Sequence, residues 1–583
     1  MHEAFAQLPE DSRAFDWQAA FPEVFARGGF DVVIGNPPYV RQEALGPLKP
    51  YLAQCYASYS GVADLYVYFY ERGLNLLAPH GKLSYIVTNK WMRAGYGEPL
   101  RRLFSEQARL EEILDFGHAP IFEDADTFPC IIVAQRQVEA ATAAASAATA
   151  TAAAVSATAT ATAATEAAAG TTTLASKDEA EATPMVSVCI VPRDRPAELA
   201  LDNYVHEHAY PVPWRRYSAE PWSLEPPEVD TLMQRIRERG VPLAEFLGVK
   251  PVYGMKTGFN EAFLIDDSTR TALIRDDPGC AEIIKPYLRG QDIKRWGPDW
   301  QGLWMIVLKS SGDHIWPWSD AGDDAEAVFA RTYPSLHAHM KPLQAKLMKR
   351  QDKGKFWWEL RSCDYYAKFE RPKIIYQVIQ FHPQYISDSK GFLGNDKTFF
   401  LPVNDLYVLA ALNSPLLWWH NWRFLPHMKD EALNPAGFRM EKLPIAEPTP
   451  EIRSEVEQQA AEALELTQQA QTASRELLGW LRVEFEIEKP GQKLTDFANL
   501  TADDFTAEVR KRRPKGAARL TPKALAELAG VHEQYAAPAR NRRVQLQAAE
   551  EHIAALVNQA YGLSADEIEL IWKTAPPRMP IGH

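Results

Sequence analysis

The chain has 583 residues, of which 46% are hydrophobic and 24% charged, a composition typical of a soluble protein with more than one core. No run of about 18 apolar residues occurs and the first residues show no basic-then-apolar signal, so we expect a cytoplasmic protein without a membrane span. The five cysteines are scattered without a CxxC pair, which argues against a zinc site or a disulfide framework. We therefore expect no metal site.

The net charge of −13 argues at first against a nucleic-acid partner. The charge is unevenly distributed, however, because residues 341–400 contain 12 Lys or Arg and 6 Asp or Glu, a local balance of +6. Two interpretations stay open for this segment: a focused DNA-binding face, or a solvated surface beside a core. The segment is also rich in aromatic side chains, namely Phe356, Trp357, Trp358, Tyr365 and Tyr366.

The first part of the chain alternates between strand and helix patterns. Residues 30–35 are expected to form a short buried strand that ends in a glycine turn, and residues 64–77 have helical spacing. A helix near residues 98–108 follows, and strands alternating with helices predict an α/β sheet. The other apolar runs that predict strands are residues 83–87, 113–116, 130–134 and 186–191.

Residues 139–183 consist almost entirely of Ala, Thr and Ser. The many threonines and the lack of periodic apolar residues oppose a packed helix. We expect a disordered insertion in a loop between two neighbouring strands, since long loops cost little stability.

Composition changes twice after this insertion. Residues 216–449 are dense in Pro, Gly and Trp with short apolar runs, which predicts an α+β domain starting near Trp222. Residues 450–583 become charged and helical, with apolar residues at i, i+4 spacing from Ile452, which predicts two antiparallel helices or a helical tail. The basic run at residues 510–515 is interpreted as a solvated loop or, alternatively, as a phosphate contact.

The strongest local signal is Asn36-Pro37-Pro38-Tyr39 directly after the first predicted strand. The lone pair of an exocyclic amine is delocalised into its ring, so two hydrogen-bond acceptors are needed to localise and aim it. The Asn36 side-chain oxygen and the Pro37 carbonyl can serve, because prolines stiffen the turn and keep its carbonyls directed. The ring of Tyr39 offers a face on which a flipped base can stack.

This motif resembles the catalytic motif of S-adenosylmethionine-dependent amino-methyltransferases. With residues 21–25 and 29–41 around it, the chain is similar to bacterial restriction–modification DNA adenine-N6 methyltransferases. The resemblance implies methyl transfer to adenine N6 in duplex DNA with base flipping, and S-adenosylmethionine as cofactor. Asn36, Pro37, Pro38 and Tyr39 would be catalytic. Pro38, Asp64 and Tyr66 would contact the cofactor, and Phe122, with Phe128 as the alternative, would stack on the base beside Tyr39.

The resemblance continues through residues 63–66 and 77–83, and into a second domain similar to the TaqI-like specificity domain of these enzymes. It implies a partial Rossmann-like catalytic domain at residues 1–215, a target-recognition domain at 216–449 and a helical C-terminal region at 450–583. The blocks that carry it in the second domain are residues 254–260, 287–293, 357–361 and 411–415. Cations in or beside these blocks are expected to contact DNA phosphates, namely Lys256, Arg289, Lys294 and Arg295.

A glycine-rich turn and a ribose-binding acid, which the cofactor needs, are not found before or after the motif. Only 35 residues precede Asn36, too few for the βαβ units that would carry them. We therefore expect an N-terminally incomplete catalytic half, active alone or with a separate chain that supplies the cofactor site.

Two alternatives stay open. A catalytically silent DNA-specificity fragment of a split methylase fits the missing cofactor motifs. A methyltransferase acting on a glutamine amide shares the motif, but such enzymes are shorter and have no large Trp-rich C-terminal domain. We predict no fused nuclease, because no convincing metal-binding constellation for one is found.

Overall fold

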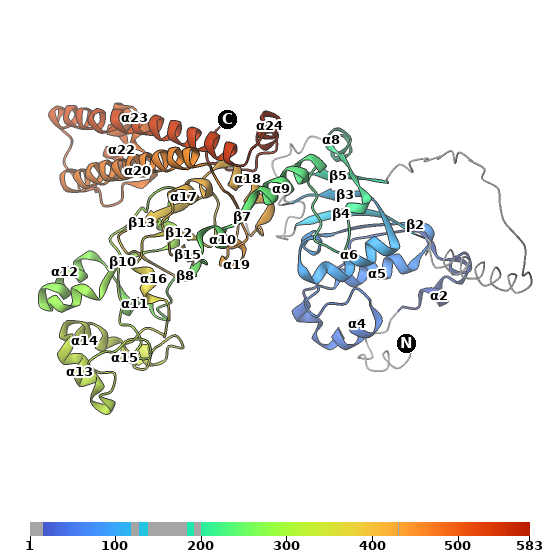
Figure 1. The fold of residues 1–583 in the computed structure, drawn as a ribbon, viewed down its shortest axis with the longest axis horizontal. Helices are drawn as coiled ribbons and strands as arrows, with labels where there is room; N and C mark the ends of the chain where they lie inside the picture. Colours follow the sequence, from blue (N-terminus) through green and yellow to red (C-terminus); the bar gives the residue numbers. More distant parts are fainter. Residues whose placement is uncertain (1–14, 118–127, 138–183, 192–199, 429–430, 583) are drawn as a thin grey trace, which may run out of the picture. The chain divides into compact units, whose positions relative to one another are not determined.

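The computed structural model describes residues 15–117, 128–137, 184–191, 200–428 and 431–582. The chain forms two compact units, Met1–Thr231 and Leu232–His583 (Figure 1). The predicted boundary at 215/216 falls inside the first unit. Trp222, where the second domain was expected to begin, packs in the first unit against Trp91, with ring centroids 5.0 Å apart.

The first unit is built on a six-stranded sheet of order β1-β2-β4-β3-β5-β6. β1 is parallel to β2 and β3 is parallel to β5, whereas the other neighbours are antiparallel. Strands form at all five predicted runs, and the α/β architecture is confirmed. The strands are β1 Phe30–Gly35, β2 Leu77–Thr88, β3 Ala108–Asp115, β4 Pro129–Arg136, β5 Met185–Ile190 and β6 Tyr210–Pro213.

Helices α5 (Tyr66–Leu76) and α6 (Glu98–Gln107) cover one face of this sheet (Figure 1). Their apolar side chains meet alternate residues of the strands, which is why both elements carry the predicted spacing. Helix α8 (Leu201–His208) packs against Leu114 and Cys189. Shorter helices precede these: α2 Trp17–Ala20, α3 Pro22–Phe25 and α4 Lys49–Cys55.

Two expectations about this sheet were wrong. β1 is an edge strand with Val32 59% and Ile34 78% exposed, because within the described residues only β2 pairs with it. The strands that flank residues 139–183 are not neighbours, because β3 lies between β4 and β5. The insertion itself lies outside the described residues.

The second unit begins within helix α9 (Pro227–Arg239) and holds three small sheets. Their orders are β14-β10-β11-β9, β13-β12-β15-β8 and β16-β7. A mixed α+β region is therefore confirmed. The strands are β7 Gly240–Pro242, β8 Val252–Tyr253, β9 Leu264–Ile265, β10 Ile284–Leu288, β11 Trp304–Ile306, β12 Lys373–Gln377, β13 Tyr385–Asp388, β14 Leu393–Gly394, β15 Thr398–Leu401 and β16 Pro444–Ala446.

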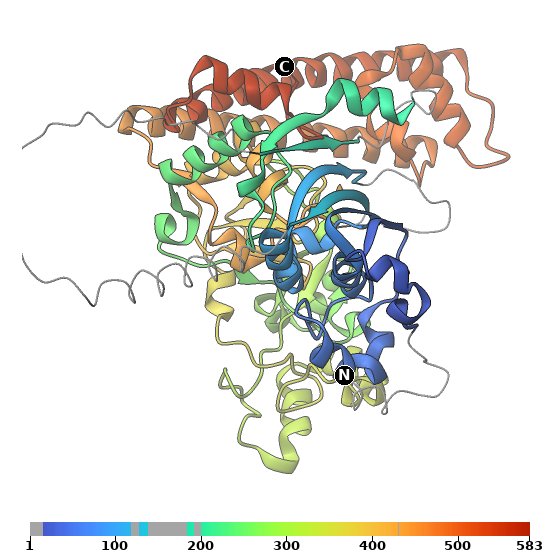
Figure 2. The same ribbon diagram turned by 90° about the vertical axis from the view of Figure 1, so that its right-hand side faces the viewer.

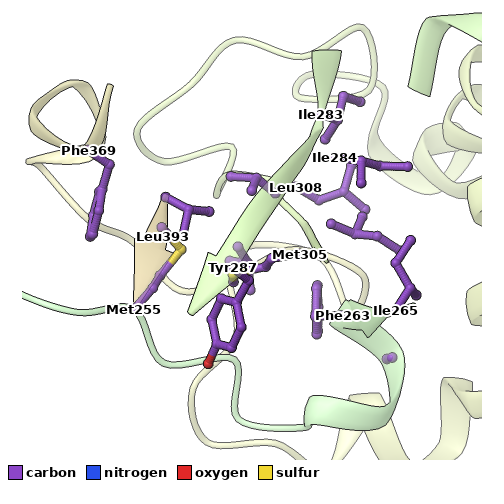
Figure 3. Close-up of a cluster of buried hydrophobic side chains, with 14 of the residues drawn as sticks. Met255, Phe263, Ile265, Ile283, Ile284, Tyr287, Met305, Leu308, Phe369 and Leu393 are labelled. Carbon is purple, nitrogen blue, oxygen red and sulfur yellow. The ribbon is translucent and has the colours of Figure 1, made fainter. Parts of the chain in front are cut away.

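One hydrophobic core is shared by the two four-stranded sheets and the helices packed against them. Figure 3 shows part of it, with Met255 and Leu393 beside each other. The helices of this region are α10 Leu243–Leu247, α11 Asn260–Phe263, α12 Asp267–Asp276, α13 Ala325–Thr332, α14 Pro334–Met340, α15 Gln344–Met348, α16 Tyr366–Phe369, α17 Leu406–Leu412, α18 Pro415–Phe424 and α19 Gly437–Met440.

The C-terminal region consists of the long helices α20 (Pro450–Phe485) and α23 (Pro522–Ala560), which run side by side (Figure 1 and Figure 2). Their ion pair and hydrogen bond join Glu455 to His552 and Glu476 to Tyr535, so the two helices are antiparallel, as predicted. Shorter helices complete the region: α21 Gly491–Thr495, α22 Ala502–Arg512 and α24 Ala565–Lys573. Among the described helices, none is both long and apolar enough to cross a membrane.

Candidate functional site

The Asn36–Tyr39 turn lies where three strands of the first unit end together. β1, β2 and β3 run in the same direction, because β1 is parallel to β2 while β4 is antiparallel to both β2 and β3. Their carboxyl ends therefore share one edge with the start of β4. Polar residues follow each strand there: Asn36 after β1, Asn89 after β2 and Asp115 at the end of β3.

The residues of the turn differ in their exposure to solvent. Asn36 and Pro38 are exposed, Pro37 is buried and Tyr39 is half-buried. The Pro38 carbonyl accepts from Val40 N–H (3.0 Å), whereas no N–H in the described residues donates to the Pro37 carbonyl. Burial raises the pKa of the Tyr39 hydroxyl to about 12. The turn thus leaves the Asn36 side chain exposed and the Pro37 carbonyl without a hydrogen-bond donor from the described residues.

Asn89 and Asp115 connect the ends of β2 and β3, between which β4 lies in the sheet. The Asn89 side-chain amide donates to Asp115 Oδ1 (2.7 Å), which also accepts from Gly117 N–H (3.0 Å). The Asn89 backbone N–H donates to the Phe128 carbonyl (2.7 Å). These bonds hold together the loops on either side of residues 118–127, so the network stabilises the edge that carries the turn.

Burial raises the pKa of the Asp115 carboxyl, and the bonds from Gly117 and Asn89 oppose the shift. The folded protein therefore keeps this proton to a higher pH than the unfolded chain, in which a carboxyl titrates near about 3.9. Stability from this group is complete below about pH 4 and is lost as the pH rises through the folded pKa. Asp115→Asn cannot ionise, so it should escape that loss.

We expect the melting temperature of Asp115→Asn, relative to the unsubstituted protein, to increase from pH 4 to pH 7. Thermal unfolding of both proteins across that range measures the difference. Asp31→Asn, at an exposed position on β1, is the control. A difference that does not change with pH would contradict the role of burial at Asp115.

The residues expected to contact the cofactor differ in their surroundings. Tyr66 is 1% exposed in the core of the first unit, and its hydroxyl is bonded to that of Tyr96 (2.9 Å). Asp64 Oδ1 accepts from Gln42 N–H (2.8 Å) and holds the loop after the turn. Tyr66 is therefore a core residue in this fold, and the cofactor contacts of Pro38, Asp64 and Tyr66 stay predictions.

The two residues expected to stack on a base are placed differently. Phe122 lies outside the described residues. Phe128 directly precedes β4 at the edge that carries Asn36, and Lys90 Nζ lies 5.2 Å from its ring centroid. An aromatic ring is thus present on this edge in addition to Tyr39.

The four cations expected to contact DNA occupy different environments in the second unit. Lys256 and Lys294 are exposed. Arg289 forms two hydrogen bonds to the Asp292 carboxylate (3.0 and 2.8 Å). Arg295 is only 18% exposed and donates to the Asn413 and Pro580 carbonyls while pairing with Glu550 (3.1 Å). This internal use removes Arg295 from the candidate DNA contacts.

The aromatic segment within residues 341–400 mainly forms core. Trp358 is 1% exposed and stacks on Phe329 and Phe356. Glu359 is fully buried and accepts bonds from Trp318 and Ser311. The interpretation as a surface beside a core therefore fits this segment better, and Tyr366 belongs to the same core while also lining a cavity.

Tyr366 lines an open cavity of about 510 Å³ in the second unit. Three lysines from separate parts of the chain, Lys285, Lys309 and Lys390, line it, and none of them makes an ion pair within the described residues. Lys309 Nζ lies 5.4 Å from the Tyr366 ring centroid, and burial together with Lys309 lowers the pKa of His314. No local sequence pattern indicates this cavity, because its lysines are far apart in sequence. The cavity also has apolar and aromatic walls, which include Met255, Ile283, Trp316, Tyr333, Phe369 and Leu393.

Known proteins resemble this chain along much of its length. The family model of the Eco57I restriction-modification methylase matches residues 2–122. The type II methyltransferase M.PaeR7I of Pseudomonas aeruginosa is 31% identical over 395 residues, which cover 67% of this chain and 59% of that protein. The type II methyltransferase M.XhoI of Xanthomonas vasicola is 27% identical over 398 residues, which cover 67% and 62%. The chain is thus similar to type II restriction–modification methyltransferases over part of their length. It spans about three fifths of the length of these two relatives.

A second family model, described as a domain of unknown function, matches residues 449–557. It coincides with the antiparallel pair α20 and α23. Among solved structures, the type IIL restriction-modification enzyme MmeI in complex with DNA matches with a TM-score of 0.42 and 11% identity, covering 90% of this chain and 57% of that one. Within the described residues, no group of three or more His, Cys, Asp and Glu side chains could hold a metal ion.

Proposed function

We propose that this chain provides the catalytic turn and the DNA-binding part of a DNA methyltransferase that methylates adenine N6 from S-adenosylmethionine, within a restriction–modification system. The observation that carries the proposal is the Asn36–Tyr39 turn at the carboxyl edge of the sheet, in a segment that matches a restriction–modification methylase model. Its exposed amide and unused Pro37 carbonyl are the two acceptors that the chemistry needs.

The residues of the turn act on the amine of a flipped adenine. The Asn36 side-chain oxygen and the Pro37 carbonyl each accept one N–H of the amine, which localises the nitrogen lone pair and orients it out of the ring plane. The ring of Tyr39 supports the base, and its raised pKa keeps the hydroxyl neutral. A water-poor site strengthens these hydrogen bonds.

S-adenosylmethionine supplies an electrophilic methyl group when it is bound. The described residues fit only part of a site for it, because Tyr66 is in the core and Asp64 holds Gln42. β1 offers an unpaired edge, and on the sheet face away from α5 it exposes Val32 and Ile34. We propose that a further α/β segment covers this edge and face and contributes the main cofactor contacts. The relatives do not point to a separate chain for it.

A catalytically silent DNA-specificity protein is the second candidate, because the cofactor residues are incomplete in the described part of the chain. Transfer of labelled methyl from S-adenosylmethionine to unmodified DNA separates the two. The chain should be assayed alone and fused to the part of M.PaeR7I that its match does not cover. N6-methyladenine in either assay supports the enzyme, whereas DNA binding without methylation in both would establish the silent protein.

The cavity lysines should contribute to DNA binding. Replacing Lys285, Lys309 and Lys390 with glutamine should weaken DNA binding and reduce its salt dependence by about 0.9 logarithmic units for each phosphate that is no longer neutralised. Fluorescence anisotropy with a labelled duplex at several salt concentrations measures both. The control removes three exposed lysines of the same unit instead, Lys250, Lys442 and Lys573. Equal behaviour of the two triple variants would remove the cavity from the proposed DNA interface.

A further inference from the structure

The connection between α22 and α23 carries an isolated concentration of positive charge. Residues 510–523, here called the basic loop, contain seven cations and no acidic residue, in a chain with a net charge of −13. The loop lies inside the segment that matches a domain of unknown function. Its cations are Arg510, Lys511, Arg512, Arg513, Lys515, Arg519 and Lys523.

Two of these cations serve the fold. Arg512 Nε pairs with Glu508 (2.8 Å) at the end of α22, and Arg513 donates to the Ala518 carbonyl (2.7 Å), which closes the loop. The other five are exposed and have no hydrogen bond or ion pair within the described residues. Glu484 and Glu527 line the same shallow pocket as Arg519, yet neither pairs with it.

Helix stability explains only two of the five unpaired cations. Positive charge at the C-terminus of α22 is favourable, which accounts for Arg510 and Lys511. Lys523, however, lies in the first turn of α23, where the helix dipole disfavours a cation. Mutual repulsion adds to this cost, so the fold gains nothing from Lys515, Arg519 and Lys523.

The loop is also held in place, which suits a preformed contact surface. Thr521 caps α23 by accepting from Ala524 N–H (3.2 Å), and Leu520 packs on the core between the long helices. The Arg513–Ala518 bond closes the segment between the helices. The cations therefore project from an anchored connection at one end of the helix pair.

We propose that the basic loop binds the phosphate backbone of duplex DNA. The region 449–557 would then bind DNA independently of its sequence. The inference rests on the proposed function, that the chain acts on DNA. Charge complementarity selects the occupant, because a dense row of phosphates matches unpaired cations without counter-ions. Contacts of this kind position a duplex and do not read its sequence.

Salt-dependent DNA binding by the full chain tests the proposal. Lys515→Gln, Arg519→Gln and Lys523→Gln together should reduce the slope of log affinity against log salt by about 0.9 for each phosphate that the loop no longer neutralises. The decrease in affinity should be the same for duplexes of unrelated sequence. The control with the same change in charge replaces Lys250, Lys442 and Lys573, and it should leave the slope unchanged.

Thermal unfolding provides a second measurement, because removing repelling charges should leave the melting temperature unchanged or higher. An unchanged slope, or a decrease in affinity confined to one duplex sequence, would overturn the role of the basic loop. A lowered melting temperature would show instead that the cations serve the fold. If the unsubstituted chain binds no DNA, the proposed function fails rather than this inference alone.

Discussion

Asn36→Ala should slow methyl transfer by about 10²- to 10³-fold while DNA affinity stays essentially unchanged. The side chain is exposed at the end of β1 and makes no hydrogen bond within the described residues, so its truncation removes no packing. The substitution removes one of the two acceptors that orient the amine, an interaction whose value is greatest as the nitrogen becomes positive. Single-turnover transfer of labelled methyl, in a preparation that is active before substitution, measures the effect.

Two further variants test whether the loss of rate is specific to the acceptor oxygen of Asn36. Asn75→Ala changes an exposed asparagine on α5 and should transfer methyl at the unsubstituted rate. Asn36→Asp keeps an acceptor oxygen at the end of β1, so we expect it to be faster than Asn36→Ala. Equal rates for Asn36→Ala and the unsubstituted protein would refute the catalytic assignment of the turn.

The spacing of apolar residues predicted the strands and helices of the first unit well. It did not predict which faces of these elements are covered by other parts of the fold. The apolar run at residues 30–35 does form β1, yet a run of hydrophobic residues cannot show whether both faces are covered. The exposure of Val32 and Ile34 arises because only β2 pairs with β1 in the described residues. Tyr66 illustrates the same limit, since helical spacing does not distinguish a core ring from one that lines a site.

Charged residues of the second unit were harder to interpret because their partners are distant in sequence. Arg295 resembled a surface cation, but its carboxylate partner, Glu550, lies on α23, more than two hundred positions later. Of the cavity lysines, Lys285 lies on β10, and Lys309 and Lys390 lie in two separate loops. No local sequence pattern therefore indicates that they lie close together. The Asn36–Tyr39 turn could be proposed from sequence because the proposed chemistry is contained in four consecutive residues.

Asp388→Ala should lower the free energy of unfolding of the second unit by about 3–5 kcal/mol. Asp388 Oδ2 lies 2.5 Å from Lys373 Nζ, and both side chains are 1% exposed. The two residues are directly opposite on the antiparallel strands β12 and β13. Burial lowers the pKa of Lys373 and the carboxylate opposes that shift, so removing the carboxylate leaves a buried ammonium without a counter-ion. Denaturant unfolding followed by fluorescence measures the destabilisation.

A second variant distinguishes the ion pair from the loop that it holds. Asp388 also accepts from Lys390 N–H (2.7 Å) and Phe392 N–H (2.9 Å), which fixes the turn along the cavity. Lys373→Met with Asp388→Leu should recover most of the stability, because no unpaired charge stays buried. The turn lacks its acceptor in both variants, so the proposed DNA contact of Lys390 should be weaker in both than in the unsubstituted protein. Asp276→Ala, at an exposed pair, should leave the unfolding transition in place. Full recovery of DNA binding by the double variant would show that the Asp388 bonds do not position the cavity wall.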